Sequence, residues 1–365
     1  MQSNAHRPFK VGILGCGNQA ADHAAAYALL AGEGVEVTGV ADVNHDRAVA
    51  FAGEHARGAQ AFASLDAMLE GAKVDAVSIV VPNKFHHGAA LAALRARKHV
   101  LCEKPPALTR EQAAEMEQFA RERGLVLTYG VLYRQMYEHL LPFVQELDEI
   151  YAATASWVRL RGVPGWGIYG DKEMQGGGAG IDLGVHVLDL AWWLMGRPLP
   201  LHASARTFAR KHFATKVNLL GNVDPDAVFT VEDTLRGTID FPYARLSLDA
   251  AFAADVAEEE VARIRLQGVH GALEFRLMTA QAGPDPACAP VIYTERHGRT
   301  LTQVIQHPLP MTSLSACSQQ VARFVAACRD GAPLLAPAED GTAVQGMLDA
   351  LYASADIDGR TVRIV

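Results

Sequence analysis

The sequence predicts a two-domain protein in which a doubly wound α/β domain is followed by a strand-rich α+β domain. Its 365 residues exceed the size at which one hydrophobic core keeps growing, so two domains are expected. Short apolar runs alternate with helical segments through the first third of the chain, a rhythm typical of a parallel sheet. From Tyr151 onward, extended segments and turns dominate. We therefore place the domains at residues 1–130 and 131–365.

Composition narrows the class of protein. Half of the residues are apolar and a fifth are charged, as in a soluble globular protein, and the net charge of −8 argues against a nucleic-acid surface. No window approaches 18 uninterrupted apolar residues, and residues 1–8 lack the apolar core of a signal peptide. The five cysteines show no Cys-x-x-Cys spacing, which favours free thiols in a reducing compartment. We expect a cytoplasmic protein without nucleic-acid or membrane partners.

The first predicted strand, residues 11–14, leads into a glycine loop. The loop reads Gly15-Cys16-Gly17-Asn18-Gln19-Ala20, and an alanine-rich helical segment follows it. The first glycine permits a tight turn, the second lets the backbone approach a pyrophosphate, and Ala20 is small enough for close packing of helix on strand. The helix N-terminus would stabilise the phosphate charge. Because glycine turns after strands are common, a purely structural turn is the alternative.

A second strand, residues 35–40, is followed by an acidic residue. Asp42 stands about where the carboxylate that binds the adenosine ribose belongs. It would accept from the ribose hydroxyls and repel a 2′-phosphate, and neither Val43 nor Asn44 is an arginine that could hold one. We therefore expect NAD rather than NADP. The alternative is that Asp42 caps a helix, although Asn44 or Asp46 could fill that role.

Three further strands complete the predicted parallel sheet, at residues 75–81, 99–102 and 125–129. Ligands of such sheets bind beyond the carboxyl ends of the strands. The residues that fall at this edge are Gly15, Asp42, Pro82, Asn83, Glu103 and Lys104.

An apolar helix predicted between the glycines at 178–180 and Gly196 carries three polar residues. Asp182, His186 and Asp189 are spaced i, i+4 and i+7, which places them on one face. Burying such groups is costly unless they are paired or used, so the cluster predicts a proton-transfer site. Carboxylates and an imidazole could instead coordinate zinc or manganese, but no further His or Cys stands at a matching spacing. No metal is expected.

The rest of the second domain reads as strands with two closing helices. Residues 241–243 read as a hairpin turn between two of the strands. A final strand at residues 361–365 could return to either domain. The predicted strands cover residues 151–160, 234–241, 245–252, 261–267 and 272–275, and the helices cover residues 313–329 and 339–355.

Taken together, these segments resemble the NAD(P)-dependent oxidoreductases of the glucose–fructose oxidoreductase, inositol dehydrogenase and rhizopine-catabolism group, the Gfo/Idh/MocA family. The Glu-Lys-Pro after a strand and the Asp-x-Gly-x-His-x-x-Asp helix are more specific than the glycine loop. The resemblance implies a Rossmann first domain and a second domain built on a large, mostly antiparallel sheet that often forms dimers or tetramers. The segments that carry it are Gly15-x-Gly17-x-x-Ala20, residues 75–77 with 82–86, residues 99–105, residues 176–189 and residues 359–362.

The resemblance also implies roles for individual residues near the cofactor. Gly15, Gly17, Asn18 and Gln19 would present the loop's backbone amides to the pyrophosphate. The residues that would surround the nicotinamide ribose are Pro82, Asn83, His86 and Glu103.

For the chemistry, the resemblance implies that Lys104 reaches the reacting carbon–oxygen bond and that His186 acts as acid/base. Asp182 would orient Lys104 or bind a substrate hydroxyl. Lys104 could instead be only a structural partner of Glu103. Arg134 follows the fifth strand, where family members often carry a polar residue near the nicotinamide. Trp166 could stack on a sugar ring, and the alternative is a surface turn with a partly buried indole.

The leading functional hypothesis is hydride transfer between a nicotinamide cofactor and a secondary alcohol of a sugar, sugar derivative or cyclitol. Two alternatives keep the same fold. One is glycoside cleavage or elimination assisted by a retained NAD, and the other is a non-catalytic dinucleotide-sensing regulator. A sensor has no need of the proton-transfer groups. We expect a homodimer or homotetramer that binds a small carbohydrate or cyclitol.

Overall fold

The computed structural model describes residues 7–164, 168–210, 229–278, 288–306 and 312–364. The chain divides into two compact units. The first unit comprises Met1–Gln135 and Thr312–Thr342, and the second comprises Met136–Met311 and Ala343–Val365.

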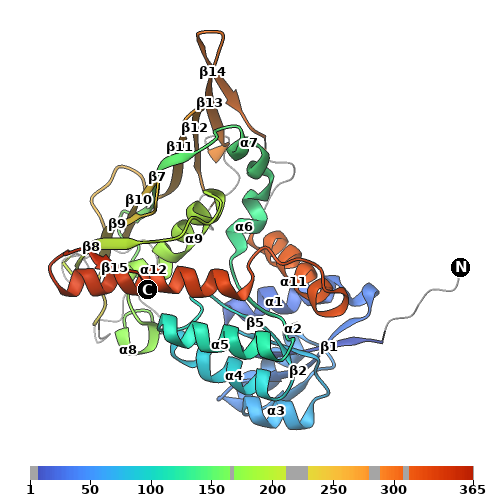
Figure 1. Ribbon diagram of the computed structural model, residues 1–365. Coiled ribbons are helices and arrows are strands. Elements are labelled where there is room, and N and C mark those ends of the chain that lie inside the picture. Colours follow the sequence, from blue (N-terminus) through green and yellow to red (C-terminus); the bar gives the residue numbers. More distant parts are fainter. Residues whose placement is uncertain (1–6, 165–167, 211–228, 279–287, 307–311, 365) are drawn as a thin grey trace, which may run out of the picture. The chain divides into compact units, whose positions relative to one another are not determined.

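A six-stranded parallel sheet forms the centre of the first unit, in the order β3-β2-β1-β4-β5-β6 (Figure 1). The predicted doubly wound parallel sheet is confirmed. The sequence did not indicate β3, because three residues are too few to show a period. The strands are β1 (Phe9–Leu14), β2 (Val35–Ala41), β3 (Gln60–Phe62), β4 (Ala76–Ile79), β5 (His99–Cys102) and β6 (Leu127–Tyr129).

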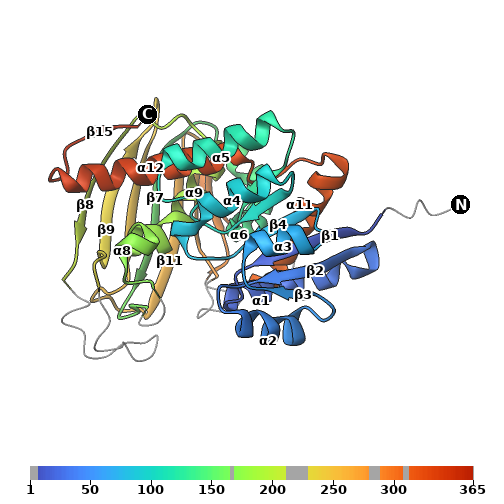
Figure 2. The same ribbon diagram turned by 90° about the horizontal axis from the view of Figure 1, so that it is seen from below.

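Two hydrophobic cores cover this sheet, because successive side chains of a strand point to opposite faces. One core joins β1 to α1, α2 and α11 and contains the fully buried Ile13 and Phe324. The other joins β4 and β5 to α3, α4 and α5 and contains Leu94 and Met116. Figure 2 shows the helices that surround the sheet. The helices are α1 (Asn18–Leu29), α2 (His45–His55), α3 (Leu65–Gly71), α4 (His86–Arg95), α5 (Arg110–Glu122), α6 (Leu132–Tyr137) and α11 (Ser313–Asp330).

The division of the chain differs from the single boundary expected near residue 130. Residues 312–342 return to the first unit, because α11 packs along α1. Cys317, Val321 and Phe324 of α11 lie in the same core as Ala24 of α1. The sequence indicates that a helix is amphipathic but does not reveal its packing partner, so this return could not be predicted.

A nine-stranded sheet forms the second unit, in the order β14-β13-β12-β11-β7-β10-β9-β8-β15 (Figure 1). Its neighbouring strands are antiparallel except β7 and β10, so the predicted mostly antiparallel sheet is confirmed. The strands are β7 (Ile150–Arg159), β8 (His202–Phe208), β9 (Thr234–Asp240), β10 (Arg245–Ala251), β11 (Glu260–Gly268), β12 (Gly271–Arg276), β13 (Val291–Arg296), β14 (Arg299–Val304) and β15 (Val362–Arg363).

Two local features of this sheet concern the turn at residues 241–243 and the final strand, whose domain the sequence left open. The N–H of Phe241 donates to the carbonyl oxygen of Ala244 across 2.8 Å, which closes the predicted turn between β9 and β10. The final strand pairs with β8 and so belongs to the second unit.

One face of this sheet is covered by α9 (Val185–Leu194), which packs on β7 and β11. Along β7, Ala153, Ala155 and Trp157 are buried, whereas Thr154, between the first two, is exposed on the opposite face. The unit also contains α7 (Leu141–Gln145), α8 (Lys172–Gln175) and most of α12 (Ala338–Asp356). Among the helices of the described ranges, none has the length and apolar character needed to cross a membrane.

Candidate active site

The glycine loop between β1 and α1 combines close packing with open access. Gly15 has φ +93°, and a Cβ there would lie 2.0 Å from the carbonyl oxygen of Val80. Only glycine fits this position. At Gly17, by contrast, a Cβ would meet no other described atom within 4 Å. The loop is therefore closed against the end of β4 at its first glycine and open at its second.

The start of α1 is suited to an anion. Its N-cap is Gly17, and no side chain of the described residues caps it, so the first N–H groups of the helix are available to a ligand. Nε2 of Gln19 is buried without a hydrogen-bond partner in the described part of the chain. A buried donor without an acceptor is costly. These features fit the pyrophosphate of a dinucleotide.

Asp42 lies at the end of β2 and is 8 % exposed. Its Oδ2 accepts the N–H of Cys16 across 3.0 Å, and its Oδ1 accepts the N–H of Asn44 across 2.8 Å. The helix-capping role falls to Asn44, whose side chain accepts the N–H of Arg47 at the start of α2. A carboxylate has about four acceptor sites, so Asp42 retains acceptor capacity for ribose hydroxyls. The carboxylate is thus fixed beside the glycine loop.

The residues after β4 divide into two groups. Pro82 and Asn83 are partly exposed at the start of a short 3-10 turn, Asn83–Phe85. His86 is fully buried, and its Nδ1 and Nε2 each lie 2.8 Å from a carbonyl oxygen, of Pro105 and Val81 respectively. Burial lowers the pKa of His86, which these two contacts offset in part. The imidazole thus ties together the segments that follow β4 and β5, and we expect a structural role for His86 in place of the predicted cofactor contact.

The Glu103 carboxylate, at the end of β5, is held from several sides. Its Oε1 lies 2.9 Å from Nε2 of His23 in α1, and its Oε2 accepts the N–H of Lys104 across 3.2 Å. A Cβ on Gly130, after β6, would lie 2.5 Å from Oε1. Burial alone would raise the pKa of Glu103, but the hydrogen bond and charge of His23 and the charge of Lys104 outweigh it and lower the pKa. Glu103 is therefore an ionised acceptor.

Sequence reasoning missed His23. A signal was present, because His23 lies on the apolar face of α1 together with Ala20, Ala24 and Tyr27. A histidine at such a position needs a partner when it is buried.

Lys104 itself is partly exposed, and its peptide bond to Pro105 is cis.

Arg134 occupies a different environment from the one expected of a substrate ligand. Its side chain is fully buried, its Nη1 donates to the carbonyl oxygen of Leu335 across 2.7 Å, and the same atom pairs with the Asp340 carboxylate. Both partners lie near the start of α12, within the first unit. A buried guanidinium requires this compensation, so we expect a structural role for Arg134 in place of the predicted substrate contact.

In the second unit, a run of glycines precedes the helix that carries Asp182 and His186. A Cβ on Gly178 would lie 2.0 Å from the carbonyl oxygen of Glu232, and one on Gly177 would lie 2.3 Å from the hydroxyl oxygen of Tyr352. These glycines are therefore required by close packing.

Glu232 and Tyr352 hold this segment in place, and neither was predicted from the sequence. The Glu232 carboxylate accepts the N–H groups of Gly178 at 2.9 Å and Gly180 at 3.0 Å, and the hydroxyl of Tyr352 at 2.7 Å. Burial raises the pKa of Glu232 despite these hydrogen bonds. An acidic residue in a loop gives no sequence signal that it will cap a distant helix.

The expected single α-helix begins instead with a π-helical turn, Gly180–Gly184, and continues as α9. Asp182 lies in the π turn and His186 in the first turn of α9, and both are partly exposed, whereas Asp189 is 3 % exposed. The His186 ring lies 5.6 Å from the Trp157 ring of β7, centroid to centroid. π turns occur often at functional sites. The single-face arrangement expected of a regular α-helix is therefore modified at Asp182.

Hydrogen bonds show which predicted residues share the edge of the first sheet. Gly15 N donates to Ala41 O at 2.8 Å, Val80 N to Leu14 O at 2.8 Å and Glu103 N to Ile79 O at 2.9 Å, which links the carboxyl ends of β1, β2, β4 and β5. Trp166 lies outside the described residues. Within the described ranges, no group of three or more His, Cys, Asp or Glu residues could hold a metal ion.

An open uncapped glycine loop and a fixed carboxylate after β2, at the edge of a parallel sheet, are typical of a dinucleotide-binding fold. Residues 9–131 match the family model described as "Oxidoreductase family, NAD-binding Rossmann fold", and residues 144–364 match "Oxidoreductase family, C-terminal alpha/beta domain". The chain therefore belongs to the Gfo/Idh/MocA oxidoreductase family, and its cofactor is NAD.

Individual relatives agree with this membership. The chain is 35% identical over 361 residues to the D-glucoside 3-dehydrogenase of Escherichia coli (strain K12), covering 97% of each protein. It is 30% identical over 193 residues to the glucose-6-phosphate 3-dehydrogenase of Bacillus subtilis (strain 168), covering 51% of this chain and 53% of that protein. The fold matches that of levoglucosan dehydrogenase in complex with NADH at a TM-score of 0.82 and 20% identity, covering 98% of this chain and 100% of that one.

Proposed function

We propose that this protein oxidises a glucoside at the hydroxyl of carbon 3, with NAD as the hydride acceptor. The observation that carries the proposal is that the first unit contains an NAD loop and Lys104 after β5, and that the second unit contains Asp182 and His186 in and after a π turn. Carbon 3 is favoured because the glucoside 3-dehydrogenase is similar along nearly the whole chain, and the names of both curated relatives refer to this position. Retained-cofactor cleavage and dinucleotide sensing find no such support.

Residues of the first unit would hold the cofactor. Gly15, Gly17, Asn18 and Gln19 would bind the pyrophosphate and Asp42 the adenosine ribose, while Pro82, Asn83 and Glu103 would contact the nicotinamide ribose. When bound, NAD supplies a nicotinamide carbon that accepts the hydride.

Side chains of the protein would take up the proton of the substrate hydroxyl and stabilise the negative charge that develops on its oxygen. His186 takes the proton of the substrate hydroxyl as that oxygen forms a carbonyl, and the Lys104 ammonium stabilises the negative charge that develops on it. The carbon–hydrogen bond breaks with both of its electrons, so the products are a 3-keto glucoside, NADH and a proton. Asp182 either orients Lys104 or binds a neighbouring hydroxyl.

The test is an activity screen with variants at these two residues. The purified protein is incubated with NAD or NADP and a panel of glucosides, sugar phosphates and inositols, and product structures are assigned by NMR. We expect a 3-keto product with NAD. Lys104→Ala and His186→Ala should retain NAD binding and lose at least about 100-fold in turnover. Near-full activity in both variants would remove the proposed mechanism, and oxidation at another carbon would remove the regiochemistry.

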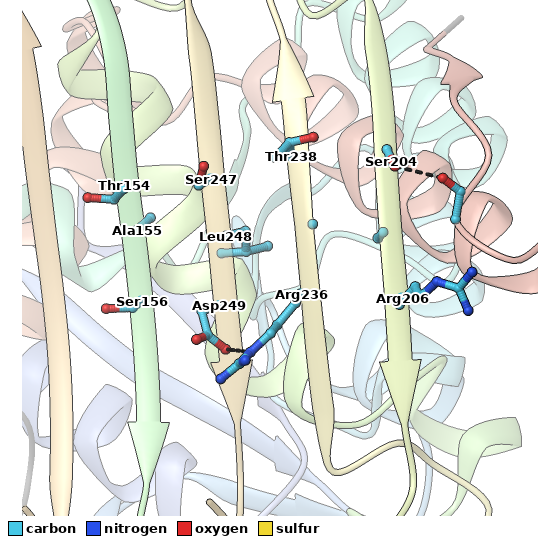
Figure 3. Close-up of a pocket in the computed structure, with 13 residues that line it drawn as sticks. Thr154, Ala155, Ser156, Ser204, Arg206, Arg236, Thr238, Ser247, Leu248 and Asp249 are labelled. Carbon is cyan, nitrogen blue, oxygen red and sulfur yellow. Dashed lines mark hydrogen bonds and ion pairs between the residues drawn. The ribbon is translucent and has the colours of Figure 1, made fainter. Parts of the chain in front are cut away.

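We further propose that copies of the chain associate through the open face of the second unit's sheet. A shallow hollow of about 610 Å³ lies there, and most of the residues that line it are polar and belong to β7, β8, β9 and β10 (Figure 3). Arg236 and Asp249 pair across neighbouring strands at 3.1 Å within it. Arg236→Glu should reduce the oligomer to a smaller species in size-exclusion chromatography with light scattering, and an unchanged mass would contradict this face. We also propose a cytoplasmic location, which the five free cysteines support.

A further inference from the structure

Glu103 and Lys104 are adjacent in sequence, and the structure shows what fixes this dipeptide. On one side, Oε1 of Glu103 lies 2.9 Å from Nε2 of the His23 imidazole. On the other side, the carbonyl oxygen of Pro105 lies 2.8 Å from the His86 ring. Both imidazoles are fully buried, and they come from different helices, α1 and α4. The Lys104 backbone is therefore held between two buried rings.

Of these two contacts, the His23 contact reaches a charged group. The Glu103 carboxylate that His23 contacts also accepts the Lys104 N–H. Two successive hydrogen bonds therefore connect His23 to Glu103 and Glu103 to the Lys104 backbone. The space is tight, because Gly130 leaves no room for a Cβ beside Oε1. The second ring nitrogen of His23, Nδ1, has no hydrogen-bond partner in the part of the chain that the structure describes. The described contacts of the His23 ring thus centre on Glu103.

We propose that His23 is a positioning residue for cofactor binding and hydride transfer: its imidazole holds the Glu103 carboxylate against the Lys104 backbone. The inference rests on the proposed function, because Glu103 there contacts the nicotinamide ribose and Lys104 the substrate oxygen. His23 contacts neither NAD nor the substrate. It fixes the orientation and the ionised state of Glu103, which contacts the nicotinamide ribose.

The pH dependence follows from the groups around Glu103. In the native protein the pKa of Glu103 is lowered, because His23 and Lys104 outweigh burial. Without His23, burial is less opposed and the pKa rises. The ionised acceptor is then lost as the pH falls through this raised value, so NAD affinity declines at a higher pH than in the native protein. The ionisable groups that interact with Glu103 are His23 and Asp22 on α1, His86 on α4, Cys102 and Lys104 beside it, and Cys317 on α11.

The experiment measures NAD binding directly, by calorimetric titration between pH 5 and 8, on the full chain. His23→Leu removes the contact, and His23→Gln keeps a donor of similar reach. We expect the Kd for NAD of His23→Leu to rise about 10-fold or more at pH 7, as for the loss of a hydrogen bond to a charged group. The affinity of His23→Leu for NAD should begin to fall at a higher pH than that of the native protein. His23→Gln should recover most of the affinity.

The matched control is Tyr27→Phe, one helical turn further along the same buried face of α1. This change removes a buried hydrogen bond of 2.8 Å to Ser78 and should leave both the Kd and its pH dependence unchanged. Asp22→Asn tests the neighbouring carboxylate of α1. This variant should show the same fall of NAD affinity at low pH as the native protein. If His23→Leu does not fold, Gly130→Ala displaces the same carboxylate from the opposite side and should reproduce the weakened binding.

Binding curves for His23→Leu that coincide with those of the native protein would overturn the proposal, as would a change no larger than that in Tyr27→Phe. The proposed function fails separately. Lys104→Ala would then remain active, whatever the NAD affinity of the His23 variants.

Discussion

The hydroxyl of Tyr352 donates to Oε1 of Glu232 across 2.7 Å, and the same carboxylate caps the N–H groups of Gly178 and Gly180. A side chain near the end of the chain is thereby linked to the glycine run that begins the Asp182 and His186 segment. The capped segment is the π turn and α9, so its start is fixed by a buried charge instead of by local sequence alone.

Tyr352→Phe should lower turnover without weakening NAD binding. Loss of a hydrogen bond to a buried charged group costs about 1.5–3 kcal/mol and loosens the start of the helix that carries His186. Steady-state kinetics and NAD titration measure the two effects. The control is Tyr137→Phe in the same unit, whose buried hydroxyl donates to Arg276 O and accepts from Met278 N. It should lose stability and keep kcat, and equal losses of kcat in both variants would contradict the positioning role.

Glu232 should make stability fall as the pH rises. Burial raises its folded-state pKa above the ordinary value of 4.5, so the folded protein binds the proton more tightly than the unfolded chain does. This contribution is full below 4.5 and is lost as the pH rises through the raised pKa. Unfolding curves between pH 4 and 8 should show this decline in the native protein and a smaller one in Glu232→Gln. Identical slopes in the two proteins would show that Glu232 titrates normally.

Asp42 should set the preference for NAD. Asp42→Ser removes the acceptor for the ribose hydroxyls and the charge that repels a 2′-phosphate, while Arg47, 3.8 Å from the carboxylate in the native protein, remains. We expect the Kd for NAD to rise about 10- to 100-fold, with a smaller change or a gain for NADP. Calorimetric titration with both cofactors measures it. Asp46→Asn, in the first turn of α2, is the control, and an equal loss for both cofactors would contradict this role.

Arg134 should prove structural. Arg134→Met leaves the Asp340 carboxylate buried without its partner, which costs about 3–5 kcal/mol. The double variant Arg134→Met/Asp340→Leu should recover much of this loss in chemical denaturation. Its KM for the sugar should equal that of the native protein. A raised KM in the stable double variant would return Arg134 to the substrate site.

The parallel sheet and its edge residues could be predicted because each depends on local sequence. The glycine loop, Asp42 and the Glu103–Lys104 pair all follow strands whose apolar runs are visible in the chain. What could not be predicted depends on distant packing: His23 meets Glu103 eighty residues away, and α11 returns to α1. The burial of Arg134 and His86 could not be predicted either, because a polar residue beside a predicted site gives no sign that the fold will bury it.

In the proposed reaction, carbon 3 of a glucoside loses a hydride to NAD. The most direct measurement uses methyl glucoside carrying deuterium only at carbon 3, with the NADH formed analysed by mass spectrometry. We expect one deuterium in each NADH and a 3-keto sugar without the label. Unlabelled NADH together with a product that retains deuterium at carbon 3 would contradict it.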